Sequence, residues 1–96
     1  MSRVALTPKA KADLNDIWDF TFARWGLVQA EKYVRDLWSV MEKQVSDLAH
    51  SIDIAEVRPG YKKVRAGSHV IFFKVTSDGI DVVRILHQKM DFDRHL

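Results

Sequence analysis

The chain has 96 residues, with 15 Lys and Arg against 13 Asp and Glu, a formal net charge of +2 and a sequence pI of about 9.0. This length predicts a single domain over residues 1–96 with one modest core. Hydrophobic residues make up 47% of the chain and charged residues 29%, which is typical of a globular protein rather than a disordered one. Cysteine is absent, which excludes a disulfide scaffold and a thiolate zinc site.

No apolar run approaches the ~20 residues that a membrane helix needs. The N-terminal segment MSRVALTPKAK also lacks the apolar region of a secretory signal, so we expect a cytoplasmic protein without membrane contact. The net charge is too small to predict direct nucleic-acid binding. No acid lies between Glu56 and Asp78, however, and positive potential should concentrate there, either on a solvated strand face or on a binding surface.

Residues 3–6 predict a short strand, and residues 7–26 predict a helix with both ends marked. Thr7 is able to cap the free N–H groups, and Pro8 suits the first helical position. Gly26 predicts the end, since glycine enters the left-handed conformation at little cost. The apolar residues of this helix recur at steps of three and four and form one stripe: Ala10, Leu14, Ile17, Trp18, Phe22 and Trp25.

A second amphipathic helix is predicted at about residues 28–49. Two such helices joined at one glycine indicate an antiparallel helical hairpin, and neither apolar stripe is stable in water. The stripe of the second helix contains Ala30, Tyr33, Val34, Leu37, Trp38, Met41, Val45 and Leu48.

Residues 50–60 predict a loop, and three strands follow at residues 61–66, 69–76 and 80–87. The predicted fold class is therefore α+β, with an N-terminal strand, the helical hairpin and a three-stranded antiparallel meander in a twisted sheet. Gly67 and Ser68 predict a two-residue hairpin connection that pairs Ala66 with His69. Side chains then alternate strictly between the two faces of the sheet.

The second turn is predicted as a three-residue loop, 77–79, that pairs Thr76 with Ile80. A two-residue loop would instead aim Arg84 into the core, where an unpaired guanidinium is expensive to bury. On the preferred register, the face against the helices holds Val64, Ile71, Phe73, Val83 and Ile85. The other face holds a mixture of apolar and basic side chains: Tyr61, Lys63, Arg65, Val70, Phe72, Lys74, Val82, Arg84 and Leu86.

This mixed face is the candidate binding surface. Nothing else in the predicted fold is left to cover it, and an apolar patch with arginines at its margin is typical of a protein-binding site. An ordinary exposed sheet face is the alternative.

Candidate chemistry is sparse. The histidines form no H-x-H or H-E-x-x-H pair, and the spacing of His87, Asp91 and His95 is a weak basis for a metal site, so no metal or cofactor is expected. Metal-free RNA cleavage would need a base, an acid and cations. Arg65, Arg84 and His87 are of suitable types, but on the preferred register His87 faces away from Arg84. The tryptophans are expected to pack in the core or at helix ends rather than to stack on bases.

Four segments together resemble the RelE/ParE superfamily of toxin–antitoxin toxins, and within it ParE. They are LTPKAKADLNDIWDFTFARWG, AEKYVRDL, RPGYKKVRAGSHVIFFKV and IDVVRILHQKMDFDRHL, which cover most of the chain. The resemblance implies a toxin that inhibits DNA gyrase by binding, without enzymatic activity, and that a ParD-like antitoxin neutralises. A ribosome-dependent mRNA endoribonuclease of RelE type is the alternative, and a degenerate toxin that only binds its antitoxin is a third.

The resemblance and the mixed face together give two sets of expected site residues, and neither is catalytic or metal-binding. The antitoxin is expected to bring an apolar segment and acidic side chains to the mixed face, at Lys63, Arg65, Val70, Phe72, Arg84 and Leu86. The C-terminal region, which is usually implicated in target binding in the family, gives His87, Met90, Asp91 and Phe92.

Overall fold

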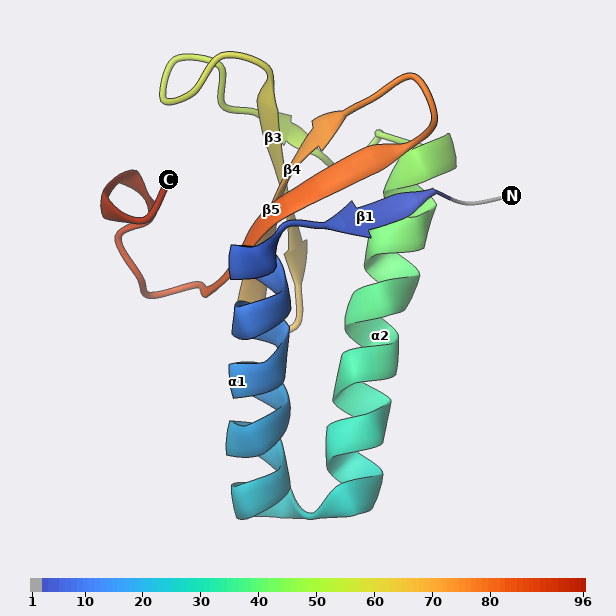
Figure 1. Ribbon diagram of the computed structural model, residues 1–96, viewed down its shortest axis with the longest axis vertical. Coiled ribbons are helices and arrows are strands. Elements are labelled where there is room, and N and C mark those ends of the chain that lie inside the picture. Colours follow the sequence, from blue (N-terminus) through green and yellow to red (C-terminus); the bar gives the residue numbers. More distant parts are fainter. Residues whose placement is uncertain (1–2) are drawn as a thin grey trace.

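The computed structural model describes residues 3–96 (Figure 1). The fold class is α+β, as the sequence predicts, with two helices and one mixed five-stranded sheet. The elements in chain order are β1 (Val4–Leu6), α1 (Pro8–Trp25), α2 (Leu27–Ser46), β2 (Ile52–Asp53), β3 (Tyr61–Ala66), β4 (His69–Val75), β5 (Ile80–His87) and the 3-10 turn η1 (Phe92–Arg94).

Local signals in the sequence set the ends of α1. The Thr7 hydroxyl accepts a hydrogen bond from the N–H of Ala10, and Pro8 occupies the first helical position. Gly26, with φ of 90°, donates its N–H to Phe22 O and is also the residue from which α2 starts. The two helices therefore form an antiparallel hairpin with a one-residue connection (Figure 1). The second helix ends at Ser46, three residues before the predicted end.

The strand order in the sheet is β1-β5-β4-β3-β2. The first strand runs parallel to β5, and the other neighbours are antiparallel. The short strand β2 lies within residues 50–60, which were expected to form a loop. Two residues are too few to show an alternating pattern of polar and apolar side chains in the sequence. The strand forms because Ile52 and Asp53 pair with Lys63 and Lys62 of β3.

The register between β3 and β4 is the predicted one, with Ala66 opposite His69. Between β4 and β5 the prediction is wrong near the turn. Val75, not Thr76, pairs with Ile80, and a β-bulge at Val83 then restores the predicted pairing from Arg84 onward. The bulge reverses two side chains, so that Val82 is fully buried in the core and Val83 packs on the opposite face.

The helices cover one face of the sheet, and the principal core lies between them (Figure 1). It is built from Ala10, Ile17, Leu37, Met41, Val64, Ala66, Ile71, Phe73, Ile80, Val82 and Ile85. The hairpin extends beyond the sheet, so the part of the α1 stripe near Gly26 is not covered. Phe22 and Trp25 are 49% and 66% exposed, which corrects the expectation that the whole stripe is buried. Of the other tryptophans, Trp38 packs against the core and Trp18 stacks on Phe22.

The bulge makes a prediction that distinguishes the two registers. Val82→Thr places a hydroxyl in the apolar core at nearly constant volume and should lower the free energy of unfolding by about 1–3 kcal/mol. The matched variant Val83→Thr should cost less than half as much, since Val83 is half-buried. Urea unfolding of both variants measures the difference, and the reverse order would support the unbulged register.

Candidate functional site

A second apolar cluster lies on the sheet face away from the helices. Ile54, Phe72 and Leu86 are 5%, 1% and 2% exposed, and Tyr61, Val70, Val83 and Leu96 pack against them. The expectation that nothing in the chain covers this face is therefore wrong. Ile54 covers it from the segment that follows β2, and Leu96 covers it from the end of the chain.

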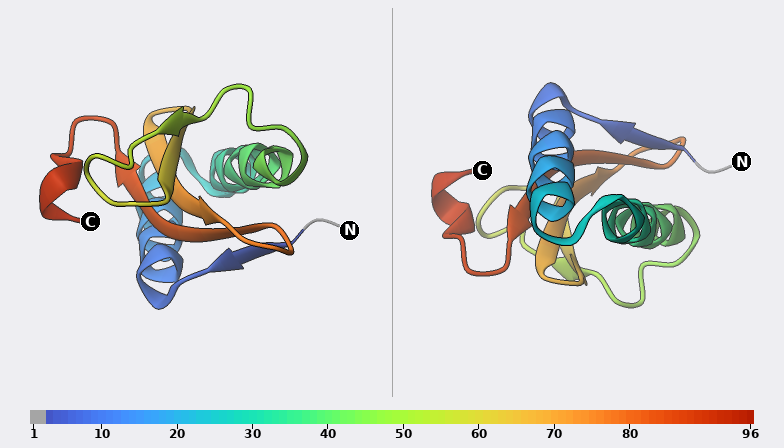
Figure 2. Two further views of the ribbon diagram at one scale, coloured as in Figure 1. Left: turned by 90° about the horizontal axis from the view of Figure 1, so that it is seen from above. Right: turned by 90° about the horizontal axis from the view of Figure 1, so that it is seen from below.

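The C-terminal tail, residues 88–96, doubles back across this outer face. After β5 the chain turns, with the N–H of Met90 donating to His87 O, and in Figures 1 and 2 the tail and α2 lie on opposite sides of β3 and β4. Two arginines hold its end: Arg58 donates two hydrogen bonds to the main-chain oxygen of Leu96, at 2.8 and 3.2 Å, and Arg84 donates one to His95 O at 3.0 Å.

Arg84 also forms a bidentate ion pair with Asp13 of α1. Its Nε and Nη2 lie 2.8 and 2.9 Å from the carboxylate oxygens of Asp13, and the N–H of Ile85 donates to the same carboxylate. The two side chains are only 17% and 13% exposed. The hydrogen bonds to Asp13 are the main reason that the pKa of Arg84 is raised above its usual value, against the opposing effect of burial.

The expectation that Arg84 is free at the margin of the mixed face is thus corrected. Beyond Val82 the edge of β5 has no β1 partner, so the Arg84 side chain reaches past this edge to α1. Sequence reasoning missed Asp13, although one signal was present: it is an acid directly beside Leu14 of the apolar stripe.

The other expected antitoxin-binding residues surround the second cluster. Phe72 and Leu86 are buried in it, and Val70 is half-buried at its side. Lys63 is half-buried, whereas Arg65 is exposed and donates to Gly67 O. The structure therefore brings the expected residues to one face, and of their three cations only Arg65 is exposed.

The expected target-binding residues lie at the end of β5 and just beyond it. His87, Met90 and Asp91 are exposed, and Met90 is a 40% exposed apolar side chain. The side chain of Phe92 lies outside the described part of the structure. The set is an open surface segment rather than an enclosed site.

A groove of about 370 Å³ separates α1 from the ends of β4 and β5. His69 and His87, which pair across the two strands, both line it, and their rings lie 5.5 Å apart in an edge-to-face arrangement. Arg84 lines the same groove because its side chain bends around the strand edge. The expectation that His87 and Arg84 point to opposite faces is correct for their positions in β5, but both side chains reach the same groove.

His69 is tied to α2 by Tyr33. The Tyr33 hydroxyl lies 2.6 Å from Nδ1 of His69 and accepts the N–H of Ser68. It donates its own proton to the ring when Nδ1 of His69 is unprotonated. Burial is the largest cause of a lowered pKa for His69, and the charge of His87 lowers it further, while Asp13 partly opposes the shift. Sequence reasoning missed this contact because Tyr33 was counted only as part of the helix stripe.

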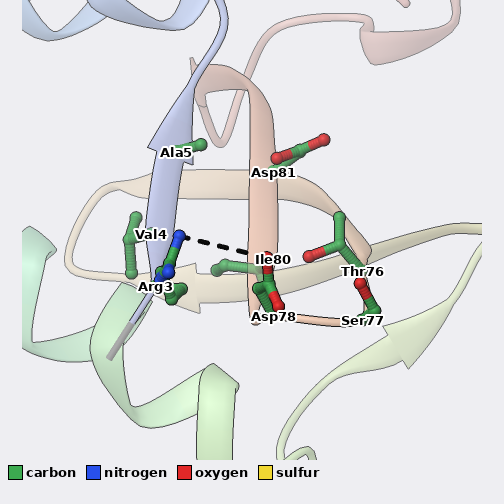
Figure 3. A pocket seen from close by; sticks show the side chains of 8 residues that line it. All are labelled: Arg3, Val4, Ala5, Thr76, Ser77, Asp78, Ile80 and Asp81. Atoms are coloured by element: carbon green, nitrogen blue, oxygen red, sulfur yellow. Dashed lines mark ion pairs between the residues drawn. The ribbon is translucent and has the colours of Figure 1, made fainter. Parts of the chain in front are cut away.

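A hollow of about 500 Å³ lies between β1 and the turn that joins β4 to β5 (Figure 3). An ion pair between Arg3 and Asp78 lies at this hollow, with 3.9 Å between the charged atoms and side chains that are 66% and 69% exposed. Exposed ion pairs of this kind contribute little to stability. None of the expected site residues lines this hollow.

Residues 3–96 contain no cluster of three or more His, Asp or Glu side chains arranged to hold a metal ion. They also contain no helix with the length and hydropathy to span a membrane.

The Asp13–Arg84 pair gives a prediction on stability. Asp13→Asn removes the negative charge but keeps the shape, and should lower the free energy of unfolding by about 2–3 kcal/mol because the guanidinium stays largely buried. Asp16→Asn, an exposed position on the same helix, should change it by less than about 0.5 kcal/mol. Equal effects in urea unfolding would contradict the role of the pair.

His69 gives a prediction on pH. Because its pKa in the folded protein is below the ordinary 6.5, the unfolded chain binds the proton first as the pH falls. The stabilising contribution is complete above about pH 6.5 and is lost below it. Denaturant unfolding between about pH 7.5 and pH 5.5 should show a smaller loss in His69→Gln than in the wild type. His50→Gln, at an exposed position, should keep the wild-type profile.

Comparison with known proteins places the chain among bacterial toxins. Residues 4–92 match the family model described as the ParE toxin of the type II toxin–antitoxin system, parDE. The chain is 49% identical over 96 residues to Toxin ParE1 of Mycobacterium tuberculosis, covering 99% of this chain and 98% of that one. It is 36% identical over 96 residues to Toxin ParE1 of Caulobacter vibrioides, covering 100% and 99%.

Solved structures show the same fold. The chromosomal ParDE system from P. aeruginosa aligns with a TM-score of 0.74 at 24% identity, over 91% of this chain and 96% of that one. The YoeB-YefM complex from Staphylococcus aureus aligns with a TM-score of 0.59 at 12% identity, over 92% and 98%. From the family match and the full-length similarity, this chain belongs to the ParE toxin family of type II toxin–antitoxin systems.

Proposed function

We propose that this toxin inhibits DNA gyrase by binding to it in the cytoplasm, and that a ParD-like antitoxin neutralises it. The observation that carries the choice of binding over catalysis is the bidentate pair of Arg84 with Asp13. The full-length similarity to ParE1 toxins supports the assignment of target and antitoxin.

Metal-free cleavage of a phosphodiester needs a base, an acid and cations that are open to the phosphate. The groove has two histidines that are suitable for proton transfer. Its cation is not open, because Nε and Nη2 of Arg84 are bonded to Asp13 and Nη1 is bonded to His95 O. A phosphate would have to compete with a carboxylate already in place, which argues against a catalytic role.

The antitoxin is proposed to dock on the outer sheet face. The face offers an apolar centre and a basic margin, and the chain carries no acid between Glu56 and Asp78, so an antitoxin segment with apolar and acidic side chains is complementary to it. The proposed contacts are Lys63, Arg65, Val70, Phe72, Arg84 and Leu86. Arg65 is the cation to reverse in a binding test, because reversing Arg84 would also leave Asp13 unpaired.

Gyrase is proposed to bind at the end of β5 and at the segment that follows it. His87, Met90 and Asp91 are exposed there and present one apolar and two polar side chains on a short turn. Phe92 stays a prediction from the sequence.

The second candidate function is an mRNA endoribonuclease of RelE type. It is favoured by one observation, the adjacent His69 and His87 in a groove that also holds Arg84. It requires Asp13 to release the guanidinium when RNA binds.

The test adds the purified toxin to a DNA supercoiling assay with gyrase and, in parallel, to a translation reaction with a reporter message. We expect dose-dependent loss of supercoiling and an increase in cleaved DNA, reversed by prior mixing with the antitoxin, and an intact message. His87→Ala separates the two candidates. Unchanged gyrase activity together with message cleavage that His87→Ala abolishes would refute the proposal and support the nuclease.

A further inference from the structure

We propose that the place where Leu96 packs on the outer face is the anchor site for the antitoxin, and that the toxin's own tail occupies this site until the antitoxin displaces it. The inference rests on the proposed antitoxin function and adds the position and chemistry of its central contact.

The first step is the shape of the outer face. A small cavity of about 90 Å³ is lined by Val70, Phe72 and Leu86, and a larger one of about 430 Å³ is lined by Tyr61, Val83 and Leu96, among others. All six side chains belong to the second apolar cluster. The cluster thus forms one apolar floor with a hollow at each side, and the tail covers part of it.

The second step is how weakly the tail is attached. Among the side chains of the tail that the structure describes, those of residues 88–91, Asp93 and Arg94 are exposed, and those of His95 and Leu96 are half-buried. The hydrogen bonds from Arg58 come from an exposed guanidinium, where solvent screening makes such contacts weak. A segment with few buried contacts opens at little cost in free energy.

The third step is the chemistry that the site selects. Leu96 contributes an aliphatic side chain to the floor, while Arg58 and Arg84 donate to the main-chain oxygens of the last two residues. An incoming peptide that replaces the tail needs an aliphatic side chain and main-chain or carboxylate oxygens within reach of the two arginines. Acidic neighbours of that side chain would match the acid-free stretch of the toxin.

Competition between tail and antitoxin has a measurable consequence. An antitoxin that binds only the open form has an apparent dissociation constant equal to its intrinsic value divided by the fraction of toxin that is open. Weakening the tail should therefore tighten binding, whereas removing an ordinary contact would weaken it.

The experiment uses the 96-residue toxin and its proposed ParD-like antitoxin. Leu96→Ala should lower the dissociation constant about tenfold through faster association. Arg94→Ala is the matched control, because Arg94 lies in the same tail but is exposed, and it should bind like the wild type. In the wild type, the Leu96 methyl NMR signals should move to positions of unstructured chain when the antitoxin is added.

Weaker or unchanged binding by Leu96→Ala, or Leu96 methyl signals that stay shifted in the complex, would overturn the displaced tail while leaving antitoxin binding intact. Absence of binding by every variant, the wild type included, would instead refute the proposed antitoxin and this inference with it.

Discussion

The ion pair between Arg84 and Asp13 is the contact on which both faces of the toxin depend. It joins residues 71 positions apart, fixes β5 against α1 and also gives the N–H of Ile85 a carboxylate partner. With its third nitrogen, the same guanidinium reaches His95 O on the outer face. One largely buried cation thus links the groove that holds the histidine pair to the tail that packs on the second cluster.

This arrangement supports the proposed binding function over cleavage. The groove keeps side chains suited to proton transfer, but its cation is saturated by a neighbour within the chain. The outer face keeps an apolar surface, but a short tail covers it. Both surfaces are therefore held by contacts inside the protein, and their activity toward partners depends on which of these contacts a partner can replace.

The sequence predicts what local chemistry determines. Thr7, Pro8 and Gly26 set the ends of the first helix, and the turn at Gly67 sets the register of β3 with β4. What could not be predicted depends on contacts between distant segments. A bulge changes the phase of a strand without a residue that marks it, β2 exists only through its pairing with β3, and the place of Leu96 is created by tertiary packing.

The extra residue at Val83 has a consequence for how this toxin tolerates change. Because the irregularity lies in mid-strand, the half of β5 next to β1 and the half that carries Arg84 and His87 are phased separately. An insertion or deletion in the connection after β4 can be absorbed at the irregular step, so it need not rotate the functional side chains to the wrong side of the sheet. The length of the turn between β4 and β5 can thereby change while Arg84 and His87 keep their orientation.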